Sequence, residues 1–96
     1  MLANILAISE YWTVTTVAYS KSALKVLSRL QPKLAARIME KVDQFAADPQ
    51  AQANNVKALA GSPYIRLQVG DWRVIMDEQG TVLLVLEIGP RGDIYR

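Results

Sequence analysis

The sequence contains no cysteine and no histidine. The absence of cysteine excludes disulfides and thiolate nucleophiles, and the absence of histidine excludes Ser-His-Asp and Cys-His catalytic systems. A zinc site would have to use carboxylates alone, so we expect neither a metal nor a cofactor. Any acid–base chemistry falls to Tyr, Lys, Arg, Asp or Glu.

Charge of one sign and long hydrophobic runs are also scarce. Eleven Lys and Arg residues against nine Asp and Glu give a net charge of +2, which is too weak to indicate a nucleic-acid partner by itself. Residues 1–10 are apolar, but they lack a basic start and are too short to span a bilayer. We therefore expect a cytoplasmic protein without a membrane partner, in which this segment is either a docked arm or a consequence of where translation was taken to start.

Length and composition indicate one small globular domain over residues 1–96, with 51% apolar and 21% charged residues. The β-branched and aromatic stretch 12–19 predicts a first strand. A helix capped by Ser20 or Ser22 follows, and a second helix covers about 32–47, with Pro32 in its first turn and Pro49 beyond its end. Because the connecting turn is short, we expect the helices to pack as an antiparallel αα-hairpin. Residues 48–63 form the one long connection.

A tight antiparallel hairpin is predicted over residues 64–76. Apolar residues alternate with polar ones on both arms, and Gly70-Asp71 fits a two-residue turn. In this register Arg66 lies diagonal to Arg73, and both guanidinium groups are on the same face. Two adjacent cations need an anion, which is either a neighbouring carboxylate or a bound phosphate.

Residues 82–88 predict a third, nearly continuous apolar strand after a turn at 78–80. If Asp77 pairs with Thr81, the apolar residues of the hairpin meet Val82, Leu84, Leu86 and Ile88. The arginine face then receives Glu87, together with an exposed apolar strip that would mark a partner site and that consists of Ile75, Leu83 and Val85. The expected fold class is α+β: an N-terminal strand, an αα-hairpin, and a three-stranded antiparallel meander that forms one small sheet with the helices on one face.

The chain closes with Arg91 and Tyr95, which follow the last strand within reach of its end. A terminal Tyr is often only a lid on the core. The order of one strand, two helices and three strands resembles the RelE/ParE toxin superfamily over roughly residues 12–96. The resemblance also includes a set of residues in a fixed order: Lys57, Leu59, Gly61, Tyr64, Arg66, Gly70, Trp72, Arg73, Arg91 and Tyr95.

The resemblance implies the toxin half of a bacterial type II toxin–antitoxin pair. RelE-like members cut messenger RNA in the ribosomal decoding site, and ParE-like members poison DNA gyrase. The closing Arg-x-x-x-Tyr is more similar to the RelE branch. The implied function is a ribosome-dependent mRNA endoribonuclease that inhibits translation; the alternatives are a gyrase inhibitor and a non-catalytic relative that only binds its antitoxin. RelE-like nucleases tend to be more basic than this chain.

Carried over residue by residue, the catalytic roles of the RelE branch fall on Arg73, Arg91 and Tyr95, with Arg66 and Lys57 as auxiliary phosphate contacts. We expect Glu87 to orient Arg73 rather than to act as a base, because an adjacent arginine lowers the pKa of a carboxyl group.

A cognate antitoxin is implied as a partner, and operator DNA would be reached only through it. It would dock either across the strip of Ile75, Leu83 and Val85 or along the αα-hairpin.

Overall fold

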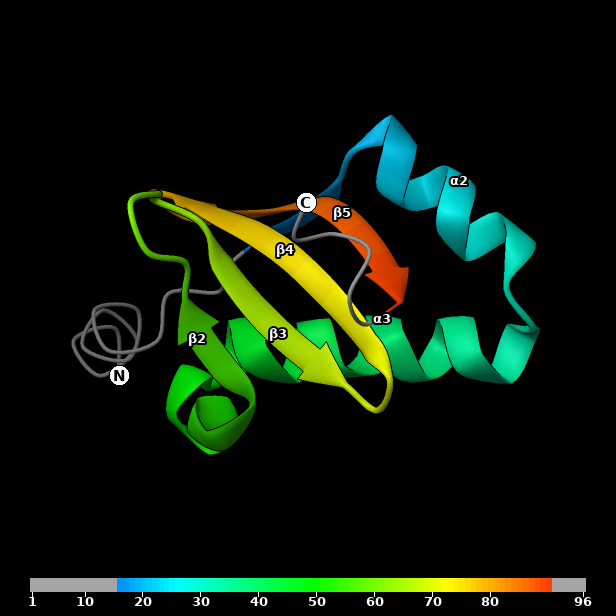
Figure 1. Cartoon of the computed structure of the whole chain (residues 1–96), viewed down its shortest axis with the longest axis horizontal. Coiled ribbons are helices and arrows are strands. Elements are labelled where there is room, and N and C mark those ends of the chain that lie inside the picture. The colour runs from blue at the N-terminus through cyan, green and yellow to red at the C-terminus, as the bar shows by residue number, and fades with distance from the viewer. Residues whose placement is uncertain (1–15, 91–96) are drawn as a thin grey trace, which may run out of the picture.

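The computed structural model describes residues 16–90, which form a five-stranded mixed sheet and two α-helices (Figure 1). The strand order is β1-β5-β4-β3-β2, in which β1 runs parallel to β5 and every other pair is antiparallel. None of the helices in residues 16–90 is long and apolar enough to cross a membrane. The elements in chain order are β1 (Thr16–Tyr19), α2 (Lys21–Arg29), α3 (Pro32–Ala47), the 3-10 helix η1 (Pro49–Asn55), β2 (Val56–Ala58), β3 (Ile65–Val69), β4 (Trp72–Gln79) and β5 (Val82–Pro90).

The hairpin of β3 and β4 has the predicted register. Val69 pairs with Trp72 and Gln68 with Arg73 around a two-residue turn, and Gly70 has the positive φ of 61° that such a turn requires. The α+β class, the second helix and the role of Pro32 in its first turn are confirmed as well. The first strand is observed over Thr16–Tyr19, and residues 12–15 lie outside the described residues.

The pairing of β4 with β5 differs from the prediction. Gln79 pairs with Val82 around a two-residue turn, and the register shifts between Ile75, which pairs with Glu87, and Met76, which pairs with Val85. Leu86 is therefore an extra residue on β5, which defines a β-bulge. An extra residue reverses the alternation of all side chains between the bulge and the turn.

The bulge places Leu83 and Val85 in the core, where they are 1% and 0% exposed. The predicted exposed strip on the arginine face was therefore wrong for both residues. The apolar side chains that β5 presents on that face are instead Val82 and Leu84, each half-buried. Glu87 does lie on the arginine face as expected, although its pairing with Ile75 was not part of the expected register.

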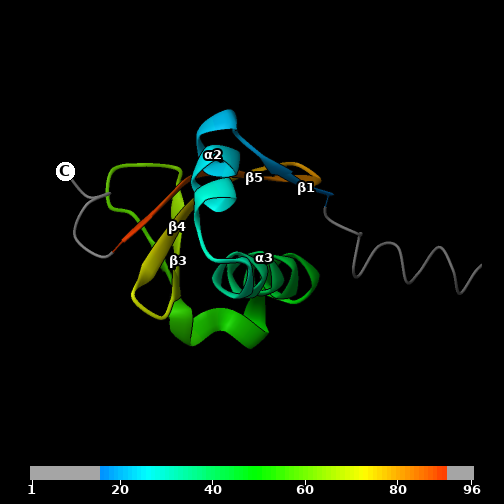
Figure 2. The same cartoon turned by 90° about the vertical axis from the view of Figure 1, so that its right-hand side faces the viewer.

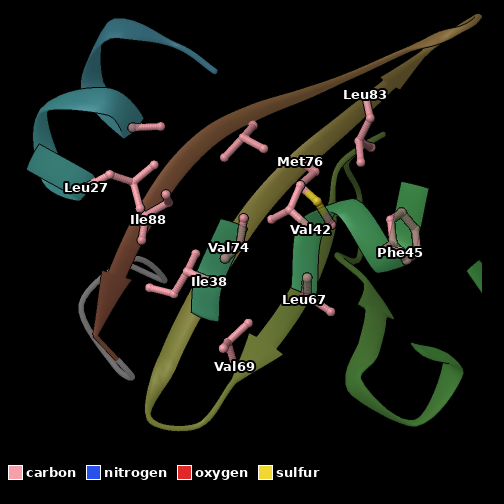
Figure 3. Packing of buried hydrophobic residues seen from close by; sticks show 12 residues of the cluster. Leu27, Ile38, Val42, Phe45, Leu67, Val69, Val74, Met76, Leu83 and Ile88 are labelled. Atoms are coloured by element: carbon pink, nitrogen blue, oxygen red, sulfur yellow. The ribbon is translucent and has the colours of Figure 1, made fainter. Parts of the chain in front are cut away.

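The expected antiparallel αα-hairpin is also absent. Each helix packs on the sheet rather than on the other helix, α2 mainly over β5 and α3 over β1 and β3. Figure 2 looks nearly along α3 and sees α2 from the side. The reason is that both apolar stripes are buried against one sheet face, in a single core (Figure 3) whose helical members are Ala23, Leu27, Ile38, Val42 and Phe45. A further strand, β2, forms within residues 48–63, for which the sequence predicted only a long connection.

Ser20 connects the first helix to the bulge. Its hydroxyl accepts a hydrogen bond of 3.0 Å from the backbone N–H of Ala23, which makes it the N-cap of α2, and donates one of 2.7 Å to the carbonyl of Leu86. Its backbone N–H also donates to the carbonyl of Val85 at 2.9 Å. One residue therefore satisfies a helix end and the carbonyl of the extra residue in β5.

Replacement of Ser20 by alanine is expected to lower the free energy of unfolding by about 2 kcal/mol, because both the N-cap and the bond to the bulge are lost. Urea denaturation measures this change. Ser22→Ala is the matched control, since Ser22 is exposed within the first turn of α2, and it should change stability by less than about 0.5 kcal/mol. Equal effects of the two substitutions would contradict the assigned role of Ser20.

Tyr19 places a hydroxyl at the core side of β1. Within residues 16–90 this oxygen is buried and has no hydrogen-bond partner. Burial, and secondarily the negative charge of Asp43, raise the pKa of Tyr19 from its ordinary value of 10.0 to about 12. The phenol is thus held neutral in the folded protein.

Because the pKa of Tyr19 is higher in the folded protein than in the unfolded chain, its contribution to stability is present below pH 10 and is lost as the pH rises from about 10 to about 12. Tyr19→Phe removes this dependence. Its free energy of unfolding should match or slightly exceed that of the wild type at pH 7, and the difference should grow in favour of Phe as the pH rises from about 10 to about 12. Parallel pH profiles in urea denaturation would show that Tyr19 is not buried as described.

Candidate anion-binding face of the sheet

The side of the sheet opposite α2 and α3, here called the open face, carries most of the predicted site residues. A row of paired positions crosses four strands: Lys57 opposite Arg66, Arg66 opposite Ile75, and Ile75 opposite Glu87. Directly opposite residues of neighbouring strands share a face. The structure therefore brings two cations, an apolar residue and a carboxylate into one line.

Arg73 lies on the same face, two residues along β4 from Ile75. It pairs with Gln68 on β3 and with Gly89 on β5, so it is diagonal to Arg66 as predicted. Gly89 has no side chain, which leaves room above β5 for a long side chain from β4. Arg73 is only 5% exposed, and its Nη1 donates to the carbonyl of Trp72 at 3.4 Å. Burial and this contact hold the guanidinium group in place.

These positions give the open face a cationic half, formed by Lys57, Arg66 and Arg73. Neighbouring cations repel one another at such separations, and a bound anion relieves the repulsion. Arginine binds phosphate well because its planar fork donates two parallel hydrogen bonds. Glu87 is exposed and lies two positions along β5 from Gly89, which places it diagonal to Arg73. In chemical terms this half can hold a phosphate next to one carboxylate.

Toward β1 the open face carries apolar side chains beside the polar residues Asp77 and Gln79, which pair with Leu84 and Val82. Parallel pairing of β1 with β5 sets Ala18 opposite Leu84 and Thr16 opposite Val82. Ala18, Val82 and Leu84 are half-buried, and Ile75 lies between them and the cations with 4% exposure. We call Ala18, Val82 and Leu84 the apolar half. The open face thus offers separate apolar and cationic surfaces to a partner.

Two of the predicted catalytic residues, Arg91 and Tyr95, lie outside the described residues. The last described strand ends at Pro90, opposite Trp72. Trp72 packs against the core, as the apolar pattern predicted. Within residues 16–90 no three Asp or Glu side chains are grouped as a metal site would require.

The sequence was also compared with known proteins. The family model of the ParE toxin of type II toxin–antitoxin systems, parDE, matches residues 17–95. The chain belongs to this toxin family. No curated protein sequence matches it significantly.

Solved structures of RelE proteins share the toxin's fold. The RelE–RelB complex of Pyrococcus horikoshii OT3 contains a chain that is 26% identical, with a TM-score of 0.69 over 84% of the toxin and 99% of that chain. The RelBE2 complex of Mycobacterium tuberculosis gives 21% identity and a TM-score of 0.63 over 82% and 93% of the two chains. The intact RelBE complex of E. coli gives 18% and 0.66 over 79% and 95%. The RelE-like fold and the superfamily assignment are therefore confirmed.

Sequence reasoning missed the apolar half of the toxin's open face. The parallel pairing of β1 with β5 and the extra residue Leu86 decide which side chains reach it. One signal was present: residues 82–86 are an unbroken apolar run, which is typical of a strand with neighbours on both sides. β5 does lie between β1 and β4, although helices cover only one of its faces.

Proposed function

We propose that the toxin is a ribosome-dependent mRNA endoribonuclease that inhibits translation in the cytoplasm and is neutralised by a cognate antitoxin. The observation that carries the proposal is the cationic half of the open face, where Lys57, Arg66 and Arg73 converge beside Glu87. The similarity to the RelE chain of P. horikoshii also supports the proposed function.

In the proposed reaction, the 2′-oxygen of a nucleotide attacks the adjacent phosphorus, the bond from phosphorus to the 5′-oxygen breaks, and a 2′,3′-cyclic phosphate forms. The 2′-hydroxyl loses its proton and the departing 5′-oxygen gains one. Arg73 and Arg66 hold the phosphate and stabilise the charge that develops on it. Alignment of the RNA on the ribosome supplies a further part of the acceleration.

The remaining roles follow from the family resemblance. Arg91 stabilises the leaving oxygen or lowers the pKa of the Tyr95 phenol, and Tyr95 transfers a proton. Lys57 adds a phosphate contact at the edge of the sheet. Glu87 orients Arg73, which its diagonal position on β5 permits.

A second function, inhibition of DNA gyrase, is favoured by one observation: the family model that matches is that of the ParE toxin. The same scaffold and the same kind of antitoxin would serve it. A non-catalytic toxin relative that only binds its antitoxin is the third alternative.

Arg66→Ala and Arg73→Lys are expected to reduce mRNA cleavage about 10²- to 10³-fold, because each removes or alters one phosphate-stabilising donor. Arg73→Lys keeps the positive charge at a position that is 5% exposed, so folding should be retained. The control is Lys33→Ala, an exposed cation on α3, which should cleave as the wild type does. Expression of each variant, mapping of mRNA 5′ ends and circular dichroism measure cleavage and folding.

The three functions give different results in this experiment. Ribosome-dependent cleavage that is lost in the open-face variants supports the nuclease. If mRNA stays intact, DNA-damage signalling appears and supercoiling by purified gyrase is inhibited, the toxin is a gyrase inhibitor and not a nuclease. Normal growth with retained antitoxin binding would indicate the non-catalytic relative.

We further propose that the cognate antitoxin docks on the open face, with apolar side chains on the apolar half and acidic side chains near the arginines. The M. tuberculosis and E. coli relatives are toxin–antitoxin complexes, and the P. horikoshii relative is a RelE–RelB complex. Leu83 and Val85 are core residues and take no part, and Ile75 offers 4% of its surface. Val82 and Leu84 replace them. Operator DNA would be reached only through the antitoxin.

Leu84→Ala is expected to weaken antitoxin binding about tenfold, because part of the apolar contact is removed. Isothermal titration with the purified antitoxin measures the change. Met39→Ala is the control, since Met39 is 39% exposed on α3 and should leave affinity unchanged. The reverse result, loss of affinity only in Met39→Ala, would move the docking site to the helices.

A further inference from the structure

Basic residues recur at a fixed interval through both helices. Six of the eleven Lys and Arg residues occupy every fourth position of the segment 21–41, and they are Lys21, Lys25, Arg29, Lys33, Arg37 and Lys41. On α3 these cations alternate with acidic residues such as Glu40 and Asp43. On α2 they do not, because its sequence KSALKVLSR contains no acidic residue.

The three cations of α2 form a stripe along its solvent side, here called the basic stripe: Lys21, Lys25 and Arg29. All three are exposed, whereas Ala23 and Leu27 on the opposite side of the helix are buried. Successive members are about 6 Å apart along the helix axis, since four residues rise 1.5 Å each. The stripe is therefore an evenly spaced row of positive charge that follows the i±4 ridge of the helix.

Helix stability does not account for this arrangement. Lys21 is the first residue of α2, where the helix dipole disfavours a cation, and Lys21–Lys25 and Lys25–Arg29 are like-charge pairs four residues apart, which destabilise a helix. Only Arg29, in the last turn, is favoured by the dipole. Helix stability therefore does not explain the two lysines, and both are exposed to an external anion.

The elements next to α2 supply no carboxylate on this side within the described residues. α2 packs on β5 and β1. The described strand β1, Thr16–Tyr19, has no acidic residue, and the single acidic residue of β5, Glu87, lies on the open face, on the other side of the sheet. Asp43 of α3 acts on Tyr19, at the core side of β1.

We infer that the basic stripe binds the phosphate backbone of double-stranded RNA, as a second nucleic-acid contact on the side of the molecule away from the cationic half. Phosphates are also regularly spaced charges, and neutralising them with Lys and Arg dominates nucleic-acid affinity. The inference rests on the proposed function for the kind of nucleic acid, since a ribosome presents structured RNA besides the substrate strand.

A membrane or an acidic protein fits the stripe less well. The apolar side of α2 is buried against the sheet, so the helix has no free apolar face to insert into lipid. Its exposed side offers one large apolar residue, Leu24 at 50% exposure, and no aromatic anchor of the kind that protein interfaces use.

The test measures binding of the full chain to an RNA duplex of about 20 base pairs between about 0.05 and 0.3 M salt. Lys21→Gln/Lys25→Gln should weaken binding about ten- to a hundredfold near 0.1 M salt and reduce the slope of log K against log salt by about 1.8, from two lost phosphate contacts. The matched control, Lys33→Gln/Lys41→Gln, removes the same charge from α3 and should stay within about twofold of the wild type.

Equal loss in both double variants would reduce the effect to net charge and overturn the inference, as would no loss in either. A polyglutamate peptide that binds more tightly than RNA through Lys21 and Lys25 would assign the stripe to an acidic protein instead. Arg66→Ala separates this inference from the proposed nuclease: it should lose mRNA cleavage, and adding Lys21→Gln/Lys25→Gln to it should weaken duplex binding by the same factor as in the wild type. A wild type that binds the duplex through the stripe without cleaving mRNA would refute the nuclease alone.

Discussion

The β-bulge at Leu86 determines which side chains the sheet presents to the core and which to the open face. β5 is paired on both edges, with β1 and β4, and is apolar over most of its length. Without the extra residue, Val85 and Ile88 would point to opposite faces, because side chains alternate along a strand. With it, both are buried in the same core, while Glu87 stays on the face of Arg66 and Arg73.

The bulge is held by the first helix. Ser20 caps α2 and bonds to the carbonyl of the extra residue, so the helix start and the strand irregularity stabilise each other. Bulges are common next to functional sites because they re-aim side chains. Here the bulge lets one strand contribute to the core, to the apolar half and, through Glu87, to the charged part of the open face.

Positively charged side chains of the toxin lie on both sides of the sheet. Lys57, Arg66 and Arg73 lie on the open face, and the basic stripe of α2 lies on the helical side of the sheet. This division explains how a chain with a net charge of only +2 can present two cationic surfaces, since the sum includes acidic residues such as Glu40 and Asp43 of α3, which belong to neither surface. The sum of charges therefore says less about partners than their positions do.

The local order of the chain was predictable from the sequence. Period-two alternation around Gly70-Asp71 determined the register of β3 with β4 and the common face of Arg66 and Arg73, because a slip by one residue would expose Ile65, Leu67 and Val69. Serine and proline marked the start of each helix. Only the tertiary structure decided the neighbours of β5, the packing of each helix on the sheet, and the faces of Leu83 and Val85. These depend on contacts between segments far apart in the chain and on one extra residue in β5, where residues 82–86 are an unbroken apolar run that carries no alternation signal.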